Sequence, residues 1–376
     1  MLPPESLSGA WLAVDLFFVK VTYQVYNADR LLSTTISNFL AVPCALWTFR
    51  GVALQAGPTT CFRTCEITST SRQCQPFALL WCTQEDHSWW IAEATIRVDT
   101  WHAPTLLLAY LPHLDYNFQR LGPDDPKVRE DVRAVDRVCG RLIDQCRTTG
   151  RRVLVVSEYG LTAVSGPIHI NRVLRDAGWI AVRDEAGTDS LDAGASEAFA
   201  VADHQIAHVH VRNPQRLEDV RSLLQSIPGV ESVLDRRAQA AIGIDHERAG
   251  DLVAISAADR WFTYYFWIDD DRAPDYARTV DIHRKPGYDP LELLVDPSIA
   301  LPAAKVGYTL AKKLMGFRYL MNVIPLDARL IKGSHGRPTD RVEDGPVMIS
   351  SERRSSDGAP IAATAIRDLI LSHLLD

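Results

Sequence analysis

The side chains best suited to chemistry come just after two apolar runs of the chain. Asp115 follows the run at 105–110, and Glu158 with Tyr159 follows the run at 152–156. Continuous apolar runs of this length are typical of strands buried on both faces of a sheet. In open α/β sheets, ligands bind beyond the carboxyl ends of the strands. Two carboxylates there repel each other unless a cation lies between them or one stays protonated, so the pattern indicates a metal site, with ordinary polar strand ends as the alternative.

Histidines supply a second kind of candidate ligand. His335 lies in the glycine-rich turn 333–336, where the lack of a Cβ permits the imidazole to approach a crowded site. His204 and His283 each follow an acidic residue closely and could supply further nitrogen ligands. Lys285 belongs to a basic turn that could face an anionic substrate. Solvated polar turns and loop salt bridges are the alternatives at each position.

Regular patterns from residue 88 onward predict the elements that would position these side chains. Helices are expected at 89–99, 124–147 and 171–177, and buried strands at 105–110 and 152–156. A strand–helix–strand order implies a right-handed crossover between parallel strands. The expected fold class is therefore α/β, with a doubly wound, mostly parallel sheet and helices on both faces.

Residues 205–250 follow a different pattern. Strands are expected at 206–211, 230–234 and 251–255, and a helix at 217–225 that ends near a Pro-Gly pair. Short strands around one helix indicate a small α+β subdomain. Beyond it, the aromatic run at 261–267 favours a buried strand over a platform for base stacking. The basic segment 305–318 favours a solvated helix face.

The composition is that of an ordinary globular protein. Of the 376 residues, 47% are apolar and 23% are charged. The net charge of −7 gives no electrostatic reason to expect nucleic acid or an anionic membrane as a partner. Neither a membrane span nor a basic signal sequence is recognised, so a cytoplasmic location is expected. The seven cysteines form neither an even disulfide framework nor paired C-x-x-C zinc knuckles.

The first 84 residues differ sharply from the rest of the chain. They hold nine charged side chains, against 78 in the other 292 residues, and five of the seven cysteines. Strand-like runs occur there only at 11–21 and 39–49. Two interpretations stay open, a buried N-terminal part of the same domain or a divergent or misread N-terminus.

The order of these features resembles the alkaline phosphatase superfamily, and within it the type I phosphodiesterase and nucleotide pyrophosphatase branch. That branch carries Asp-x-x-x-His, then Asp-His-Gly, then x-His-Gly, and these residues hold two divalent metals, usually zinc. The corresponding segments here are 111–122, 155–160 and 333–336. The resemblance covers residues 88–345. It implies an alkaline-phosphatase-like fold and a metal-dependent hydrolase of phosphate esters or diphosphates.

Several positions depart from the family pattern. Asp115 matches the family aspartate, but Gln119 stands where histidine is usual, and Glu158-Tyr159 replaces the Asp-His pair. Only His335 is kept as the family has it. The resemblance implies metal ligands at Asp115, Glu158, His335 and Gln119, with zinc or manganese as the cofactor. The oxygen-rich character of this set suits manganese or magnesium better than zinc.

The resemblance also assigns roles to the N-terminal segment. The family uses an N-terminal aspartate as a metal ligand, for which Asp15 is the candidate, and a Thr or Ser nucleophile further along. Pro43 stands at the nucleophile position, so Cys44, Thr48 and Thr35 are the substitutes to be considered.

The leading hypothesis is hydrolysis of a small phosphorylated substrate contacted by Tyr159, His283 and Lys285. One alternative is a family member that has lost its catalytic parts and acts as a binding or scaffold protein. Another is an incomplete polypeptide in which residues 1–84 do not form the first strands. The expected organisation is a divergent N-terminal segment or first strands at 1–87, an alkaline-phosphatase-like core at 88–204 and 251–345, a small subdomain at 205–250, and a C-terminal tail and helix at 346–376.

Overall fold

The computed structural model describes residues 16–21, 46–48, 52–54, 84–281, 284–352 and 360–375. Their contacts divide the chain into two compact units. The first unit comprises the described residues of Met1–Asn117, Asp125–Gly160 and Thr339–Asp376, and the second comprises those of Phe118–Asp124 and Leu161–Pro338. The division falls within a helix, α4 (His113–Leu121), which contributes residues to both units.

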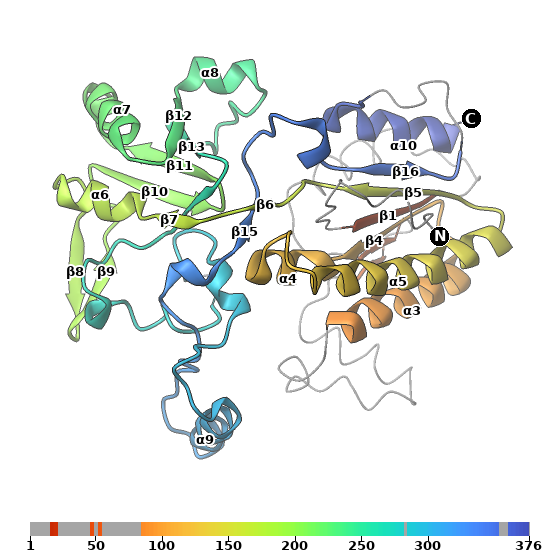
Figure 1. The fold of residues 1–376 in the computed structure, drawn as a ribbon, viewed down its shortest axis with the longest axis horizontal. Coiled ribbons are helices and arrows are strands. Elements are labelled where there is room, and N and C mark those ends of the chain that lie inside the picture. The colour runs from red at the N-terminus through yellow and green to blue at the C-terminus, as the bar shows by residue number, and fades with distance from the viewer. Residues whose placement is uncertain are drawn as a thin grey trace. The chain divides into compact units, whose positions relative to one another are not determined.

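The first unit is built on a six-stranded sheet (Figure 1). In sheet order its strands are β16 (Met348–Ser350), β5 (Arg152–Ser157), β1 (Leu16–Val21), β4 (Leu106–Leu111), β2 (Leu46–Thr48) and β3 (Val52–Leu54). Each described pair is antiparallel, which differs from the mostly parallel pairing expected. The reason is β1, which lies between β4 and β5 and runs opposite to both. The two predicted strands therefore still run in the same direction.

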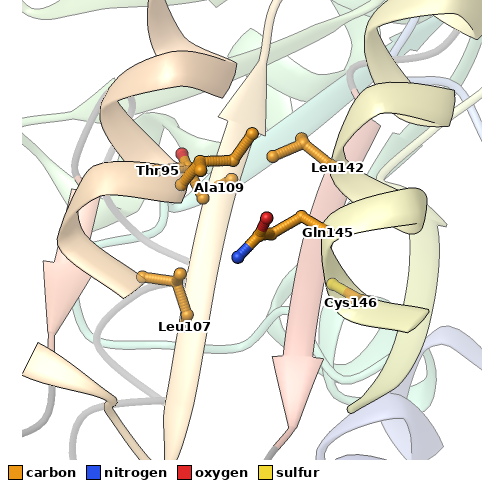
Figure 2. A pocket seen from close by; sticks show the side chains of 7 residues that line it. Thr95, Leu107, Ala109, Leu142, Gln145 and Cys146 are labelled. Carbon is orange, nitrogen blue, oxygen red and sulfur yellow. The ribbon is translucent and has the colours of Figure 1, made fainter. Parts of the chain in front are cut away.

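Helices cover both faces of this sheet, which confirms the α/β class (Figure 1). α3 (Gln84–His102) and α5 (Val128–Thr148) lie on one face, and α10 (Ile366–Leu375) lies on the other. Because strand side chains alternate, Leu106 and Leu108 pack with Ile370 of α10, whereas Leu107 and Ala109 face α3 and α5. Figure 2 shows this second set around a small apolar gap that is closed by Leu142, Gln145 and Cys146.

The predicted helix at 124–147 begins at Val128, later than expected, and keeps its apolar stripe. The buried side chains of α5 recur at helical spacing: Val128, Ala134, Val135, Val138, Cys139, Leu142 and Cys146. The predicted helix at 89–99 is part of the longer α3. No helix among the described residues combines the length and the apolar character that crossing a bilayer requires.

The second unit centres on a four-stranded antiparallel sheet, β10 (Ala198–Asp203), β11 (Ile206–Val211), β13 (Leu252–Ser256) and β12 (Val230–Leu234). Its helices are α6 (Ile170–Asp176), α7 (Leu217–Ser226), α8 (Arg236–Ala241) and α9 (Pro302–Leu314). Three two-stranded pairs join β6 (Thr162–Ala163) to β15 (Gly333–Ser334), β7 (Gly166–Ile168) to β14 (Arg260–Phe262), and β8 (Val182–Glu185) to β9 (Thr188–Leu191). The segment 205–250, expected as a small α+β subdomain, lies within this unit.

Short 3-10 helices complete the two units, at Pro214–Arg216, Asp270–Arg272, Pro290–Leu293, Ala328–Leu330, Val342–Asp344 and Ala363–Ala365. The predicted solvated helix in the 305–318 segment is α9, whose residues are mostly exposed. The strands predicted at 206–211, 230–234 and 251–255 and the helix predicted at 217–225 are all present, with ends that shift by at most one residue.

The aromatic run at 261–267 is buried as expected, but only its first two residues belong to a strand. Beyond these two residues, backbone carbonyls of the run accept hydrogen bonds from side chains of α6 and not from a neighbouring strand. Asn171 donates to the carbonyl of Tyr264 over 3.3 Å, and Arg172 donates to that of Trp267 over 2.6 Å. The prediction of a strand over the whole run was therefore wrong, because side-chain donors replace the sheet ladder.

Candidate functional site

Asp115 lies at the carboxyl end of β4, in the first turn of α4. The strand ends at Leu111, and the helix begins two residues later. A carboxylate in the first turn is stabilised by the partial positive charge of the helix N-terminus. The half-buried side chain is thus held at the edge of the sheet, where the sequence placed it.

Polar contacts fix the start of α4 against α3 and α5. Ser88 Oγ lies 3.1 Å from His113 Nδ1, and His113 Nε2 lies 3.9 Å from Asp131 Oδ1. Asn117 donates to the same carboxylate over 2.9 Å. These contacts restrain the turn that carries Asp115. Sequence reasoning missed them, although the position of His113 two residues before Asp115 was an available signal.

The end of β5 meets this turn within the same unit. Tyr159 Oη donates a hydrogen bond to Asp115 Oδ1 over 3.3 Å, and Glu158 is exposed beside it. Gly160 follows, and a Cβ there would lie 2.1 Å from the carbonyl oxygen of Asp344, so only glycine fits. The structure therefore brings the first two predicted motifs together, because β4 and β5 run in the same direction.

Gln119 belongs to the second unit and is completely buried. Its backbone carbonyl accepts a hydrogen bond from Lys332 N over 2.8 Å. Neither atom of its side-chain amide has a hydrogen-bond partner among the described residues, and the hydroxyl of buried Ser334 has none there either. Buried amides are nearly always hydrogen-bonded, so this side chain is a candidate for contact with a bound group.

His335 follows β15 and lies against His204. The two ring centroids are 3.8 Å apart, and the ring centroid of Tyr288 lies 4.5 Å from that of His204. Gln205 N donates to the carbonyl of His335 over 2.8 Å, which holds the two segments together. The structure thus places His204, an additional ligand candidate from the sequence, in contact with the one histidine that the motifs keep.

Burial sets the charge state of these two imidazoles. Burial lowers the pKa of His335 well below its usual value, and the neighbouring His204 lowers it further. Burial also lowers the pKa of His204, against a smaller opposing effect of Asp203. Both rings are therefore neutral at pH 7, which is the form of histidine that coordinates metals.

Lys285 does not have the position that the sequence predicted for a substrate contact. Its ammonium group is buried, and it lies 2.8 Å from Asp289 Oδ2 and 2.7 Å from Glu292 Oε1. Burial raises the pKa of Asp289, while the charge of Lys285 lowers it. Two buried carboxylates need this cation, so Lys285 stabilises its own loop and is not presented to a substrate.

The family model described as type I phosphodiesterase / nucleotide pyrophosphatase matches residues 26–289. The chain belongs to this family. The match includes the first two motifs and ends before the turn that holds His335. No curated protein matches the chain significantly.

Two solved structures show a distant similarity to this chain. Phosphonoacetate hydrolase from Sinorhizobium meliloti 1021, in complex with phosphonoformate, has a TM-score of 0.44 and 13% identity, and the match covers 77% of this chain and 56% of that one. Murine ectonucleotide pyrophosphatase / phosphodiesterase 5 has a TM-score of 0.35 and 16% identity, over 66% and 64% of the two chains. The chain thus spans between half and two thirds of the length of these proteins.

The remaining candidate residues from the sequence are only partly within the described residues. Asp15, Thr35, Cys44 and His283 lie outside them, and Thr48 lies at the end of β2. Asp115 and Glu158 belong to the first unit, whereas Gln119 and His335 belong to the second. Within the part of the chain that the structure describes, no three His, Cys, Asp or Glu side chains gather as a metal-binding group.

Proposed function

We propose that this family member hydrolyses phosphate esters or diphosphates. The observation that carries the proposal is the hydrogen bond from Tyr159 to Asp115, because it joins the first two family motifs at the ends of parallel strands. Ligands of α/β sheets bind at such strand ends. Family membership supports the same reaction class.

We propose further that the reaction depends on a divalent cation, with zinc or manganese as the candidates. Asp115, Glu158, Gln119 and His335 would be ligands by their motif positions, with Asp15 as a further one. The chemistry of the donors fits, because the buried Gln119 amide has no hydrogen-bond partner in the described part of the chain and His335 is neutral. When bound, the cation would polarise the phosphoryl oxygens and lower the pKa of the attacking group.

The protein's own residues would orient this site. Tyr159 holds the carboxylate of Asp115 through its phenol, and His204 limits the rotation of the His335 ring by packing against it. Contacts that metal ligands make with neighbouring side chains fix the geometry of the ligands. A hydroxyl or thiol from Thr35, Thr48 or Cys44 is the proposed nucleophile, with a small phosphorylated substrate contacted by Tyr159 and His283. A cytoplasmic location stays a prediction from the sequence.

An assay of the purified chain tests this proposal. Two substrates, bis(p-nitrophenyl) phosphate and a dinucleoside diphosphate, are supplied separately, each with zinc, manganese or magnesium. Turnover with at least one cation, lost on chelation and on the replacement Asp115→Ala, is the expected result. Absence of turnover with every cation, under conditions in which an active family member works, would count against the hydrolase.

A catalytically impaired binding protein is the second candidate, and two observations favour it. Gln119 and the Glu158-Tyr159 pair replace the usual ligands, and the phenol of Tyr159 already occupies the Asp115 carboxylate. Elemental analysis after purification separates the two candidates. Near-stoichiometric metal that is lost in Asp115→Ala and His335→Ala favours the hydrolase, whereas a folded, metal-free protein favours the binding protein.

A further inference from the structure

Large apolar side chains gather on α9 and the turn that follows it. Figure 1 shows α9 standing apart from the four-stranded sheet of its own unit. We call residues 301–319 the α9 patch. Its large exposed side chains, with their exposed fractions, are Leu301 (71%), Tyr308 (67%), Leu314 (86%), Met315 (64%), Phe317 (60%) and Tyr319 (38%). Exposed apolar side chains gathered in one segment are a feature of interaction surfaces.

The helix is fixed so that this face points outward. Thr309 is buried, and Val306 packs against the core of the unit. Thr309 Oγ1 also donates to the carbonyl of Lys305 over 2.9 Å within the helix. One side of α9 is therefore anchored, and the exposed apolar residues belong to the opposite side and to the turn beyond it.

Charge is distributed unevenly around the patch. The 30 residues at 297–326 contain four basic side chains and no acidic one, in a chain whose net charge is −7. Arg318 pairs with Asp275 over 2.9 Å. Lys305, Lys312 and Lys313 have no carboxylate within salt-bridge distance among the described residues. The total charge of the protein thus conceals a local cationic segment.

The basic and apolar groups lie side by side. Lys312 Nζ is 5.8 Å from the centre of the Tyr308 ring, and Lys313 Nζ is 5.2 Å from that of Tyr319. Lysine stems can lie along an apolar layer while the ammonium stays in water, and tyrosine is suited to the same boundary. Protein interfaces are depleted in lysine, whereas membrane-surface helices are enriched in it.

We propose that the α9 patch binds the surface of an anionic phospholipid bilayer. The helix would lie in the plane of the interface, with Leu314, Met315 and Phe317 inserted among the acyl chains. Lys305, Lys312 and Lys313 would contact lipid phosphates. The patch supplies both contributions that interfacial binding requires, apolar burial and attraction to anionic headgroups. This proposal is independent of the hydrolase activity.

Co-sedimentation of the full chain with vesicles tests the proposal. Vesicles of phosphatidylglycerol and phosphatidylcholine in equal parts are compared with phosphatidylcholine alone. We expect binding to the anionic vesicles that is at least about tenfold tighter than to the neutral ones and that weakens at high salt. Lys312→Glu with Lys313→Glu, and separately Leu314→Ser with Phe317→Ser, should each weaken it about tenfold or more. Arg237→Glu with Arg248→Glu, which changes the charge equally on exposed positions elsewhere, should bind like the parent protein.

Three outcomes would overturn the proposal. They are no binding of the parent protein to anionic vesicles, equal binding to neutral ones, or full binding by both patch variants. Sedimentation velocity addresses a different occupant, since self-association that depends on Leu314 and Phe317 without vesicle binding would show that a second copy of the chain covers the patch. Circular dichroism of each variant confirms that it is folded, and the comparison of lipids and salt with the parent protein does not depend on any variant.

Discussion

Tyr159 donates its phenolic hydrogen to Asp115 over 3.3 Å, and this bond joins the ends of two strands that run in the same direction. Tyr159 stands where the family's second motif has histidine. Its phenol is uncharged at neutral pH and is not a usual metal ligand. The phenol can hold the carboxylate in place for a cation, or it can take the place of one. The two roles have opposite consequences for metal affinity.

Replacing Tyr159 with Phe distinguishes these roles. Loss of a long, partly buried hydrogen bond should lower the free energy of unfolding by about 0.5–1.5 kcal/mol. If the phenol orients Asp115, metal affinity should fall by about tenfold or more, as it does when other side chains that hold a metal ligand in place are removed. Urea unfolding and a metal titration followed by calorimetry measure the two effects. The control Tyr308→Phe alters an exposed ring and should change stability by less than about 0.5 kcal/mol. A rise in affinity would instead show that the phenol competes with the cation.

Gln119 offers a test in which stability and function should change in opposite directions. Its amide is buried without a hydrogen-bond partner among the described residues, so Gln119→Leu removes a desolvated polar group. We expect the metal-free protein to become more stable by about 1 kcal/mol, within the usual cost of an unsatisfied group. Metal-dependent turnover should fall. Gln119→His, which restores the family's residue, should favour zinc over manganese. A large loss of stability in the leucine variant would show that the amide has a partner.

The local elements of the fold were predictable because their signals are local. The apolar runs that became β4 and β5 and the helical stripe of α5 depend on neighbours within one element. The direction of β1 was not predictable, since it is set by strands that follow much later in the chain. The same holds for Tyr264, whose carbonyl is bonded by Asn171 from a distant helix.

The candidate site divides in the same way. Motif order placed Asp115 and Tyr159 at the ends of two strands of one sheet, and the structure joins them although β1 lies between these strands. The burial of Lys285 was not predicted, because a basic residue in a polar turn is expected to be exposed. Only the fold shows that Asp289 and Glu292 enclose it. Nothing in the spacing of His204 indicates that its ring packs against that of His335, 131 positions later in the sequence.

Lys285→Met tests whether that lysine is structural. The substitution leaves Asp289 and Glu292 buried without their cation, so stability should fall by about 3–5 kcal/mol. Thermal and urea unfolding measure the loss. The matched change Lys305→Met on exposed α9 should cost less than about 0.5 kcal/mol. A stable Lys285→Met protein with a raised KM would restore the role in substrate binding.

His169 should make stability dependent on pH. Burial lowers its pKa to about 4, and the charge of Arg172 contributes to the shift. Its usual pKa is near 6.5. Below that pH the unfolded chain binds a proton that the folded protein does not, so the contribution of His169 is complete above about pH 6.5 and is lost as pH falls toward 4. The slope is at most about 1.4 kcal/mol per pH unit.

The variant His169→Phe keeps an aromatic ring near Tyr265, which the imidazole stacks on at 5.6 Å, and removes the titration. Urea unfolding at pH 7, 6 and 5 should show a shallower decline than in the parent protein. Part of the decline should persist, because burial also lowers the pKa of His204, His208 and His335. Parallel curves for the two proteins would contradict the shift. Loss of the 2.8 Å contact with Thr263 should lower stability equally at each pH.

Gly333 approaches closely the backbone segment that carries Gln119. A Cβ at Gly333 would lie 2.1 Å from the carbonyl oxygen of Phe118. The backbone fixes the positions of both atoms, so neither can rotate away. Gly333→Ala should therefore cost about 1–3 kcal/mol and reduce turnover by displacing the Gln119 segment. Gly307→Ala is the matched control, because a Cβ there meets nothing within 4 Å and alanine favours the α9 helix by about 0.5–1 kcal/mol. Thermal unfolding and the phosphodiester assay on both variants measure the difference. Equal effects of the two substitutions would mean that the strand pair β6–β15 can shift to admit a side chain, and that Gln119 does not depend on this contact.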